Sequence, residues 1–250
     1  MKLDLSRPRQ ELAAQIVAST SGHPYYAFHS PRYATLLSLI ARHLDRREGR
    51  ILDIGPTEFT DVLREQFALP VDSLGFQPDG ATGRGRHFRF DLNDTQWREK
   101  WRTDLPAYDL VVLAEVIEHV HTAPSLVLSF LRTLVRPGGI LIVQTPNAVR
   151  FGARIKLLLG RQPYQLISED VTSPAHFREY TDGEIRAYAS GAGFDVVETI
   201  FCSYFDIRFA RHDPSEARPH SVLKLVNSVY RHLPPRWRTG MTSVLARTGD

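Results

Sequence analysis

Polar side chains that could bind or activate a ligand follow five short apolar runs of the sequence, each at the point where the run ends. They are Asp53 and Gly55; Gln77 and Asp79; Asp91, Asn93 and Asp94; Glu115, Glu118, His119 and His121; and Gln144, Thr145 and Asn147. Carboxylate and amide oxygens accept hydrogen bonds from hydroxyl and amine donors. The set therefore indicates a ligand rich in such donors, and it is a stronger signal than any one of its members.

Two common phosphate-binding loops are absent from the sequence. There is no GxxxxGK[ST] segment, and the turn in ILDIGPTEFT, residues 51–60, has one glycine where a dinucleotide fingerprint has GxGxxG. A triphosphate or a dinucleotide is therefore disfavoured as the ligand. For this reason the sequence disfavours an enzyme that binds a nucleotide sugar or NAD.

The elements that position these side chains alternate between strand and helix. The candidate strands are 50–55, 71–76, 86–92, 108–114 and 139–145, and two more follow at 194–205 and 241–248. The candidate helices are 8–19, 31–47, 59–68, 94–101, 125–135, 148–160 and 181–193, and a loop is expected at 19–30. Such alternation predicts a doubly wound α/β fold with a parallel sheet, which binds ligands at the carboxyl ends of its strands.

Composition excludes several classes of protein. A chain of 250 residues with 42% hydrophobic residues can bury a large core, and its single cysteine, Cys202, favours a reducing, cytoplasmic location over a disulfide framework. No apolar run approaches the length of a membrane span, and the first residues do not have the pattern of a signal peptide. The net charge of +3 is too small to predict binding to nucleic acid. The composition carries no information on oligomeric state.

Five segments together resemble the class I S-adenosylmethionine-dependent methyltransferases. They are ILDIG (51–55), FDLND (90–94), YDLVVLAEVIEHV (108–120), RPGGILIVQTPN (136–147) and HFREYT (176–181), and the resemblance covers residues 48–202. The sequence is most similar to the small-molecule branch that includes ubiquinone-biosynthesis O-methyltransferases and enzymes that modify sugars or lipid-linked glycans. The resemblance implies a seven-stranded, mostly parallel sheet whose last strand is antiparallel, with S-adenosylmethionine as the cofactor.

The resemblance also implies roles for individual residues. Asp53 and Gly55 match the loop that approaches the methionine part and the ribose of the cofactor. Asp91 and Leu92 match the position that faces the adenine. Glu115 matches a loop between cofactor and substrate, and His119 matches a position near the substrate.

Two departures from the family pattern concern the cofactor. The glycine-rich loop of the family often reads GxGxG, and this chain has Gly55, Thr57 and Phe59 at those positions. Where the family usually has an acidic residue that binds the ribose hydroxyls, this chain has Gln77, with Asp79 two residues further on. A carboxylate accepts two hydroxyl bonds more strongly than an amide does. These departures motivate a second hypothesis, a catalytically inactive methyltransferase-like scaffold or regulator that binds S-adenosylmethionine or S-adenosylhomocysteine.

The segment EVIEHVH is the candidate for catalysis. The ordinary pKa of histidine lies near neutral pH, so His119 is a candidate general base, with Glu115 beside it. On a regular helix Glu115 and His119 would share one face, but a zinc or iron site needs a third ligand, and Glu118 and His121 would point elsewhere. No metal site is therefore expected. A charge-paired loop and a site role are equally compatible with His176, Arg178, Glu179 and Tyr180 of HFREYT.

The remaining expectations concern organisation. Residues 1–47 are expected to form N-terminal helices, and residues 48–250 a methyltransferase domain with a helical insertion at about 205–240. Two roles are compatible with Tyr25, Tyr26 and His29, a lid over the substrate or an N-terminal helix that packs on the sheet. The basic amphipathic segment 220–233 could contact a membrane surface or simply pack on its own domain. The leading hypothesis is methyl transfer from S-adenosylmethionine to a hydroxyl of a small molecule, and the choice of oxygen rests on the resemblance alone.

Overall fold

The computed structural model describes residues 2–19, 24–44, 49–67, 69–82, 85–169, 175–205, 225–226, 228–230 and 232–249. Within these residues the chain forms one eight-stranded sheet in the order β3-β4-β2-β1-β5-β6-β8-β7. The strands are β1 (Ile51–Ile54), β2 (Val71–Gly75), β3 (Gly80–Thr82), β4 (Gly85–Arg89), β5 (Tyr108–Ala114), β6 (Val135–Pro146), β7 (Phe194–Cys202) and β8 (Gly240–Arg247). The helices are α1 (Arg9–Ser19), α2 (Pro24–His43), α3 (Glu58–Gln66), α4 (Pro124–Leu134), α5 (Phe151–Leu158) and α6 (Asp182–Gly191), with 3₁₀ turns η1 (Leu92–Gln96), η2 (Arg98–Lys100), η3 (Ile117–His119) and η6 (Pro235–Trp237).

Parallel pairing brings five strand ends to one edge of the sheet. β1 pairs in parallel with β2 and β5, so that Asp53 lies level with Ser73 and Val112. β4 is parallel to β2, and β6 is parallel to β5. The carboxyl ends of β1, β2, β4, β5 and β6 therefore meet, which is the arrangement predicted from the sequence. β8 runs antiparallel between β6 and β7, as expected for the last strand.

The sheet has one strand more than the seven expected. β3 is only three residues long and pairs antiparallel with β4 at the outer edge. Its sequence, Gly-Ala-Thr, has no apolar run and no residue that favours a strand strongly enough to be recognised. The additional strand leaves the predicted α/β class and the antiparallel last strand unchanged.

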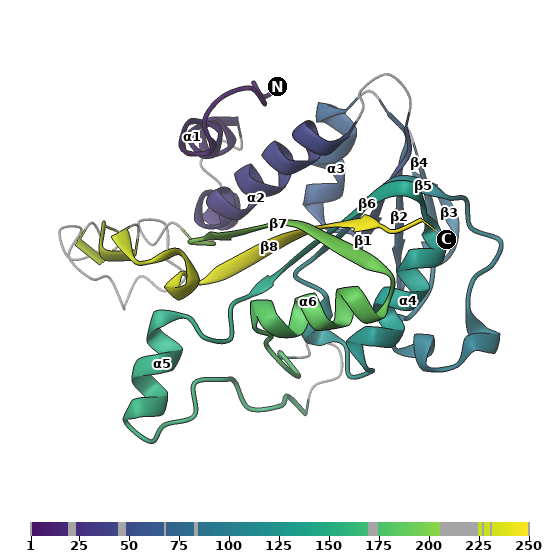
Figure 1. Cartoon of the computed structure of the whole chain (residues 1–250). Coiled ribbons are helices and arrows are strands. Elements are labelled where there is room, and N and C mark those ends of the chain that lie inside the picture. The colour runs from purple at the N-terminus through teal and green to yellow at the C-terminus, as the bar shows by residue number, and fades with distance from the viewer. Residues whose placement is uncertain are drawn as a thin grey trace.

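Helices cover both faces of the sheet. α1, α2 and α3 lie on one face, and α4 and α6 lie on the other, while α5 projects away from the sheet (Figure 1). Leu37 of α2 and Leu63 of α3 share one core cluster with Val112 of β5, and Val127 of α4 and Ile185 of α6 belong to the other cluster. Because both faces are covered, every residue of β1 is buried, and this explains its apolar sequence.

The second helix begins earlier than predicted. The sequence suggested a loop over 19–30 and a helix from Pro31, whereas α2 begins at Pro24 and contains Pro31 in its interior. A proline there leaves the carbonyl of Ala27 without its usual backbone donor. The hydroxyl of Ser30 donates to that carbonyl at 2.9 Å and replaces the missing bond. The helix therefore extends through the predicted loop and carries Tyr25, His29 and Arg32 toward the strand ends.

Two predicted helical stretches form tight turns instead. Residues 94–101 are predicted to be a helix, but the chain forms η1 and η2, and Asp91 caps η1. In EVIEHVH, Glu115 has a positive φ of 56°, so a regular helix cannot start there, and only η3 follows. The i, i+4 geometry assumed for Glu115 and His119 is therefore wrong.

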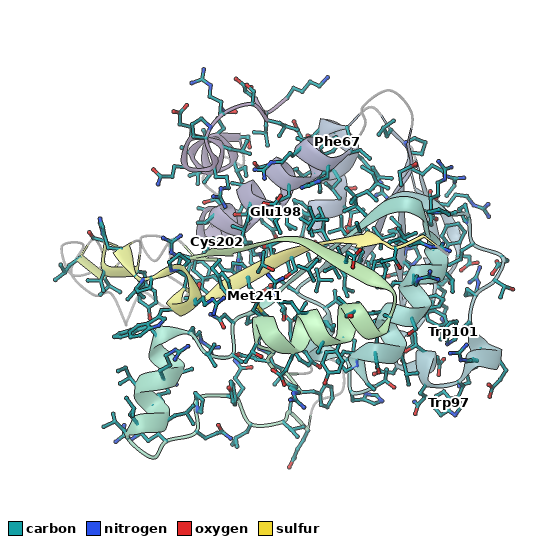
Figure 2. The ribbon with its side chains drawn as sticks, viewed as in Figure 1. Phe67, Trp97, Trp101, Glu198, Cys202 and Met241 are labelled. Atoms are coloured by element: carbon teal, nitrogen blue, oxygen red, sulfur yellow. The ribbon has the colours of Figure 1, made fainter. Side chains whose placement is uncertain are left out.

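The second helix is fastened to the far edge of the sheet. Glu198 of β7 accepts hydrogen bonds from Arg42 of α2 at 2.9 and 3.1 Å and contacts Nε2 of His43 at 2.8 Å. Figure 2 shows Glu198 and Cys202 on β7, beside α2. The half-buried thiol of Cys202 accepts from the hydroxyl of Thr35 of α2 at 3.5 Å, which agrees with a packing role for this cysteine. These contacts fix α2 relative to the sheet and hence relative to the strand ends.

The predicted insertion at about 205–240 and the basic helix at 220–233 fall largely outside the described residues. Residues 225–226, 228–230 and 232 are helical, and η6 follows them. None of the described helices combines the length and the apolar character needed to cross a bilayer.

Candidate active site

The turn after β1 uses its single glycine for backbone geometry. Gly55 has φ of 72°, and a Cβ at this position would lie 2.7 Å from Cγ2 of Val116. Thr57 caps α3 by accepting from the backbone N–H of Phe59 at 3.2 Å. The second glycine position of the family loop is thus a helix cap, and at the third position Phe59 is a buried ring that stacks on Tyr33 of α2. One glycine is enough to form this turn, because Gly55 is the only residue of the turn that has a left-handed backbone conformation.

Asp53 is a buried carboxyl group directly before this turn. It is 3% exposed, and its Oδ2 accepts from the hydroxyl of Thr60 at 2.6 Å. Burial raises the pKa of Asp53 to about 7, although the bond from Thr60 and the charge of Arg64 act in the opposite direction. A cationic ligand group beside Asp53 would favour its ionised form.

A first cavity of about 390 Å³ opens at the ends of β1, β2, β4 and β5. Its lining residues are Ile54, Gly55, Pro56, Leu74, Gly75, Phe76, Gln77, Phe90, Asp91, Leu92, Asn93, Glu115, Val116, His119 and Val120. Asp91 accepts from both the backbone and the side-chain N–H of Asn93, at 2.8 and 3.0 Å, which fixes its carboxylate at the cavity. Apolar walls with a few fixed polar groups suit a flat heterocycle bearing hydroxyl groups.

Gln77 and Asp79, both predicted after β2, have different surroundings. Gln77 lines the first cavity, and its Oε1 would lie 3.3 Å from a Cβ on Gly75. Asp79 is exposed and lines neither of the two cavities at the strand ends. It accepts from Arg102 at 3.1 Å and from the backbone of Arg89 at 2.5 Å, and the bond from Arg102 lowers its pKa. Asp79 is therefore held by Arg102 and Arg89 outside both cavities.

A second cavity of about 330 Å³ adjoins the first. It is lined by Tyr25, His29, Arg32, Tyr33, Leu36, Asp53, Ile54, Gly55, Thr57, Phe59, Ala114, Glu115, Val116, Glu118, His119, Gln144, Pro146, His176 and Phe205. The residues that line both cavities are Ile54, Gly55, Glu115, Val116 and His119. Of the predicted lid residues, Tyr25 and His29 line the second cavity, whereas Tyr26 does not. Arg32, Phe205 and, in the first cavity, Phe76 are lining residues that the sequence did not single out.

Glu115 occupies the boundary between the cavities. Its backbone N–H donates to Gln144 at 2.8 Å, and its Oε2 accepts from Arg32 of α2 at 3.1 Å. Burial raises the pKa of Glu115 to about 7, and the charges of Arg32 and His176 limit the rise. A non-glycine residue with positive φ costs about 1–3 kcal/mol, a strain that is common at functional sites.

The segments EVIEHV and HFREYT meet at the second cavity. The backbone N–H of Phe177 donates to the carbonyl of Glu118 at 2.8 Å, and the rings of His119 and His176 lie 4.8 Å apart, edge to face. The side chain of Glu118 is fully buried, and its Oε2 accepts from Thr145 at 3.0 Å. Burial and the nearby carboxylate of Glu115 raise the pKa of Glu118. The contact between these segments brings His176 of HFREYT next to His119 of EVIEHV.

Glu179 of HFREYT lies behind His176, away from the cavity lining. It contacts Nδ1 of His176 at 3.2 Å and forms an ion pair with Arg150. Burial raises the pKa of Glu179, but the bonds from His176 and Arg150 outweigh it, so the net pKa is lowered. Of the other residues in this motif, Arg178 pairs with Glu184, and Tyr180 is buried in the core cluster beside α6.

The chain is similar to known proteins in sequence and in fold. The family described as "Methyltransferase domain" matches residues 27–199. A probable S-adenosylmethionine-dependent methyltransferase from Mycolicibacterium smegmatis is 30% identical over 146 residues, which are 58% of this chain and 49% of that protein. The match thus spans about half the length of this curated relative.

Solved structures are similar in fold at low sequence identity. A putative methyltransferase from Haloferax volcanii, in complex with the Trm112 activator, has a TM-score of 0.57 at 14% identity, covering 97% of this chain and 98% of that one. A 1,6-didemethyltoxoflavin-N1-methyltransferase from Burkholderia thailandensis, with bound S-adenosylhomocysteine, has a TM-score of 0.51 at 15% identity, covering 100% and 94%. With the family match over residues 27–199, the chain belongs to the methyltransferase-domain family, whose methyl donor is S-adenosylmethionine.

Proposed function

We propose that this protein transfers a methyl group from S-adenosylmethionine to a hydroxyl of a small molecule of the quinone, sugar or lipid-linked glycan type. The observation that carries the proposal is the pair of adjoining cavities that share Gly55, Glu115 and His119. Cofactor and acceptor must approach each other within a few ångströms, and a shared wall allows this. When bound, the cofactor supplies an electrophilic methyl group.

The first cavity fits the adenosine part of the cofactor. Leu92 and Phe90 provide apolar walls for the adenine, and Asp91, held by Asn93, can accept from a cofactor hydroxyl or amine. Gln77 lies where it can accept from the ribose hydroxyls. Gly55 and Gly75 add no side chain to this wall of the cavity. At Gly75 there is also no room for one, since a Cβ would lie 2.8 Å from Cδ of Pro56.

The methionine part would extend toward the second cavity. Asp53 lines that cavity beside Gly55, and a carboxylate there can bind the cofactor's ammonium group. The acceptor would occupy the remainder of the second cavity, below Tyr25, His29 and Arg32 of α2. These α2 residues agree with the predicted role of the N-terminal helices as a lid.

Glu115 and His119 are the proposed catalytic residues. Both reach the cofactor cavity and the acceptor cavity. His119 can accept the acceptor's hydroxyl proton as general base, and Glu115, fixed by Arg32, can orient the acceptor by accepting a hydrogen bond. Positioning of the acceptor would supply most of the rate enhancement.

A catalytically inactive scaffold that binds the cofactor remains the second candidate. The one-glycine turn and Gln77 motivate it, and the second cavity argues against it, because a scaffold has no need of an acceptor site. Incubation with S-adenosylmethionine carrying a labelled methyl group, together with a metabolite extract, separates the two. Label in a small molecule, lost in the Glu115→Gln variant, supports the enzyme; binding without transfer supports the scaffold.

A further inference from the structure

Three side chains at the second cavity form a group that could hold a metal ion. One ligand atom from each of Glu118, His119 and His176 lies within 4.8 Å of the others. We propose that Glu118, His119 and His176 bind one divalent transition-metal ion, with Glu115 available as a fourth ligand. The sequence prediction of no metal rested on a regular helix and on the lack of a third ligand. η3 replaces that helix, and the third ligand comes from residue 176.

Two carboxylate oxygens of EVIEH, one of them on a member of this group, are buried without a partner. Within the described ranges, Oε1 of Glu118 and Oε1 of Glu115 are buried and have no hydrogen-bond partner. The side chain of Glu118 is 0% exposed, and only its other oxygen is satisfied, by Thr145. A buried carboxylate with an unsatisfied oxygen costs several kcal/mol, and two such groups near each other repel. A divalent cation between them would satisfy both oxygens.

The contact of His176 with Glu179 leaves the other ring nitrogen of His176 available to a metal ion. Its Nδ1 lies 3.2 Å from Oε1 of Glu179, and a carboxylate can only accept, so Nδ1 carries the proton. The lone pair of this tautomer is then on Nε2, the atom on the other side of the ring. Glu179 is itself held by Arg150. A histidine that donates one N–H to a carboxylate and binds metal with its other nitrogen is a common arrangement in metal sites.

The backbone fixes the separation of the two segments that supply ligands. The N–H groups of Phe177 and Arg178 both donate to the carbonyl of Glu118, at 2.8 and 3.3 Å. His176 is therefore held next to Glu118 and His119 by bonds that do not involve the ligand side chains. In a metal site with bonds of about 2.1 Å, ligand atoms lie roughly 3–4 Å apart, so movements of about 1 Å would close the site.

The ligand types select the class of metal. Two imidazoles with one or two carboxylates suit Zn²⁺, Mn²⁺ or Fe²⁺, whereas Mg²⁺ and Ca²⁺ prefer oxygen ligands. A metal ion at this place would face the acceptor region of the second cavity, and its open positions could bind the acceptor oxygen and lower the pKa of the hydroxyl. This extension rests on the proposed function; metal binding itself does not. It would make His119 a ligand instead of a general base.

The test is metal binding by untagged protein that has been stripped with a chelator and dialysed. Calorimetric titration with the chlorides of Zn²⁺, Mn²⁺ and Mg²⁺ should give one site per chain for Zn²⁺ and Mn²⁺ and weaker binding of Mg²⁺. His176→Ala and Glu118→Gln should weaken binding at least about tenfold. His121→Ala is the matched control, because His121 lies two residues from His119 but is exposed and outside the group. Its binding should equal that of the wild type.

Equal metal binding by the wild type, His176→Ala and Glu118→Gln would overturn the proposal, since the ions would then be on other histidines. Absence of a one-to-one site in the wild type would overturn it as well. Circular dichroism melting shows whether each variant folds. If His176→Ala does not fold, His176→Gln is used in its place. Binding of S-adenosylhomocysteine is measured in the same samples. In the wild type, absence of S-adenosylhomocysteine binding counts against the proposed function. Binding of S-adenosylhomocysteine by a wild-type protein that has no metal site counts against the metal site alone.

Discussion

Arg32 of α2 forms an ion pair with Glu115 at 3.1 Å, with both side chains mostly buried. The same guanidinium donates to the hydroxyls of Tyr25 and Tyr33, at 3.2 and 3.3 Å. The pair joins the N-terminal helices to the strained turn after β5. The proposed lid and the boundary between the two cavities are therefore one connected unit.

Removal of this buried cation should destabilise the protein more than removal of an exposed one. Arg32→Ala leaves Glu115 buried without its partner, and we expect the free energy of unfolding to fall by about 3 kcal/mol. Arg42→Ala is the control, because Arg42 pairs with Glu198 at the surface and should cost less than about 1 kcal/mol. Urea denaturation measures both. Equal losses would show that the Arg32 pair contributes no more than a surface pair.

Gly55, the single glycine of the turn after β1, should be needed for its left-handed backbone conformation and for the close approach of Val116. Gly55→Ala places a Cβ against Val116 and strains a backbone with φ of 72°, so we expect instability and about tenfold weaker binding of S-adenosylhomocysteine. Gly160→Ala is the matched control, since Gly160 has φ of 67° but nothing within 4 Å of its Cβ position. It should lose about 1 kcal/mol of stability and no affinity. Undiminished cofactor binding by Gly55→Ala would contradict the close approach.

Asp53 should make both stability and cofactor affinity depend on pH. Its pKa is raised from 3.8 to about 7, so the folded state keeps a proton that the unfolded state has lost, and stability should fall as pH rises from about 4 to 7. A cationic cofactor favours the ionised carboxylate, so affinity should rise between pH 5.5 and about 7, where the ligand's ammonium stays protonated. Titration calorimetry at several pH values tests this. An unchanged pH profile in Asp53→Asn would assign the effect to another group.

Gln77→Glu should tighten cofactor binding. A carboxylate accepts hydrogen bonds from the ribose hydroxyls with charge assistance, and a gain of about 1 kcal/mol corresponds to about fivefold in Kd. Asp79→Asn is the comparison, because the Asp79 side chain is bound to Arg102 and should not affect affinity. Weaker binding by Gln77→Glu would place the ribose elsewhere.

Features set by local patterns could be predicted from the sequence. The buried strand ending at Ile54, the turn at Gly55 and the carboxylate at Asp53 follow from one apolar run and its end. Asp91 and Leu92 follow in the same way from the segment FDLND. Because parallel strands bring their carboxyl ends together, these residues were also predicted to lie close to one another, and Gly55, Asp91 and Leu92 line one cavity.

Features set by long-range contacts could not be predicted from the sequence. Arg32 and Glu115 are 83 residues apart along the chain, and nothing local marks an arginine within an apolar helix as part of a site. The prediction of a helix in EVIEHVH was wrong because Glu115 has a positive φ. A glutamate rarely adopts this conformation, so the sequence contains no sign of it. That error also hid the neighbourhood of His119 and His176, which depends on backbone bonds to Glu118.

Binding of S-adenosylmethionine in the first cavity is measured by calorimetric titration of the purified protein with S-adenosylmethionine and S-adenosylhomocysteine. We expect one site per chain with a Kd in the micromolar range, about −8 kcal/mol, and clearly weaker binding by Gly55→Ala. Absence of binding by either ligand, or equal binding by Gly55→Ala and the wild type, would contradict this expectation.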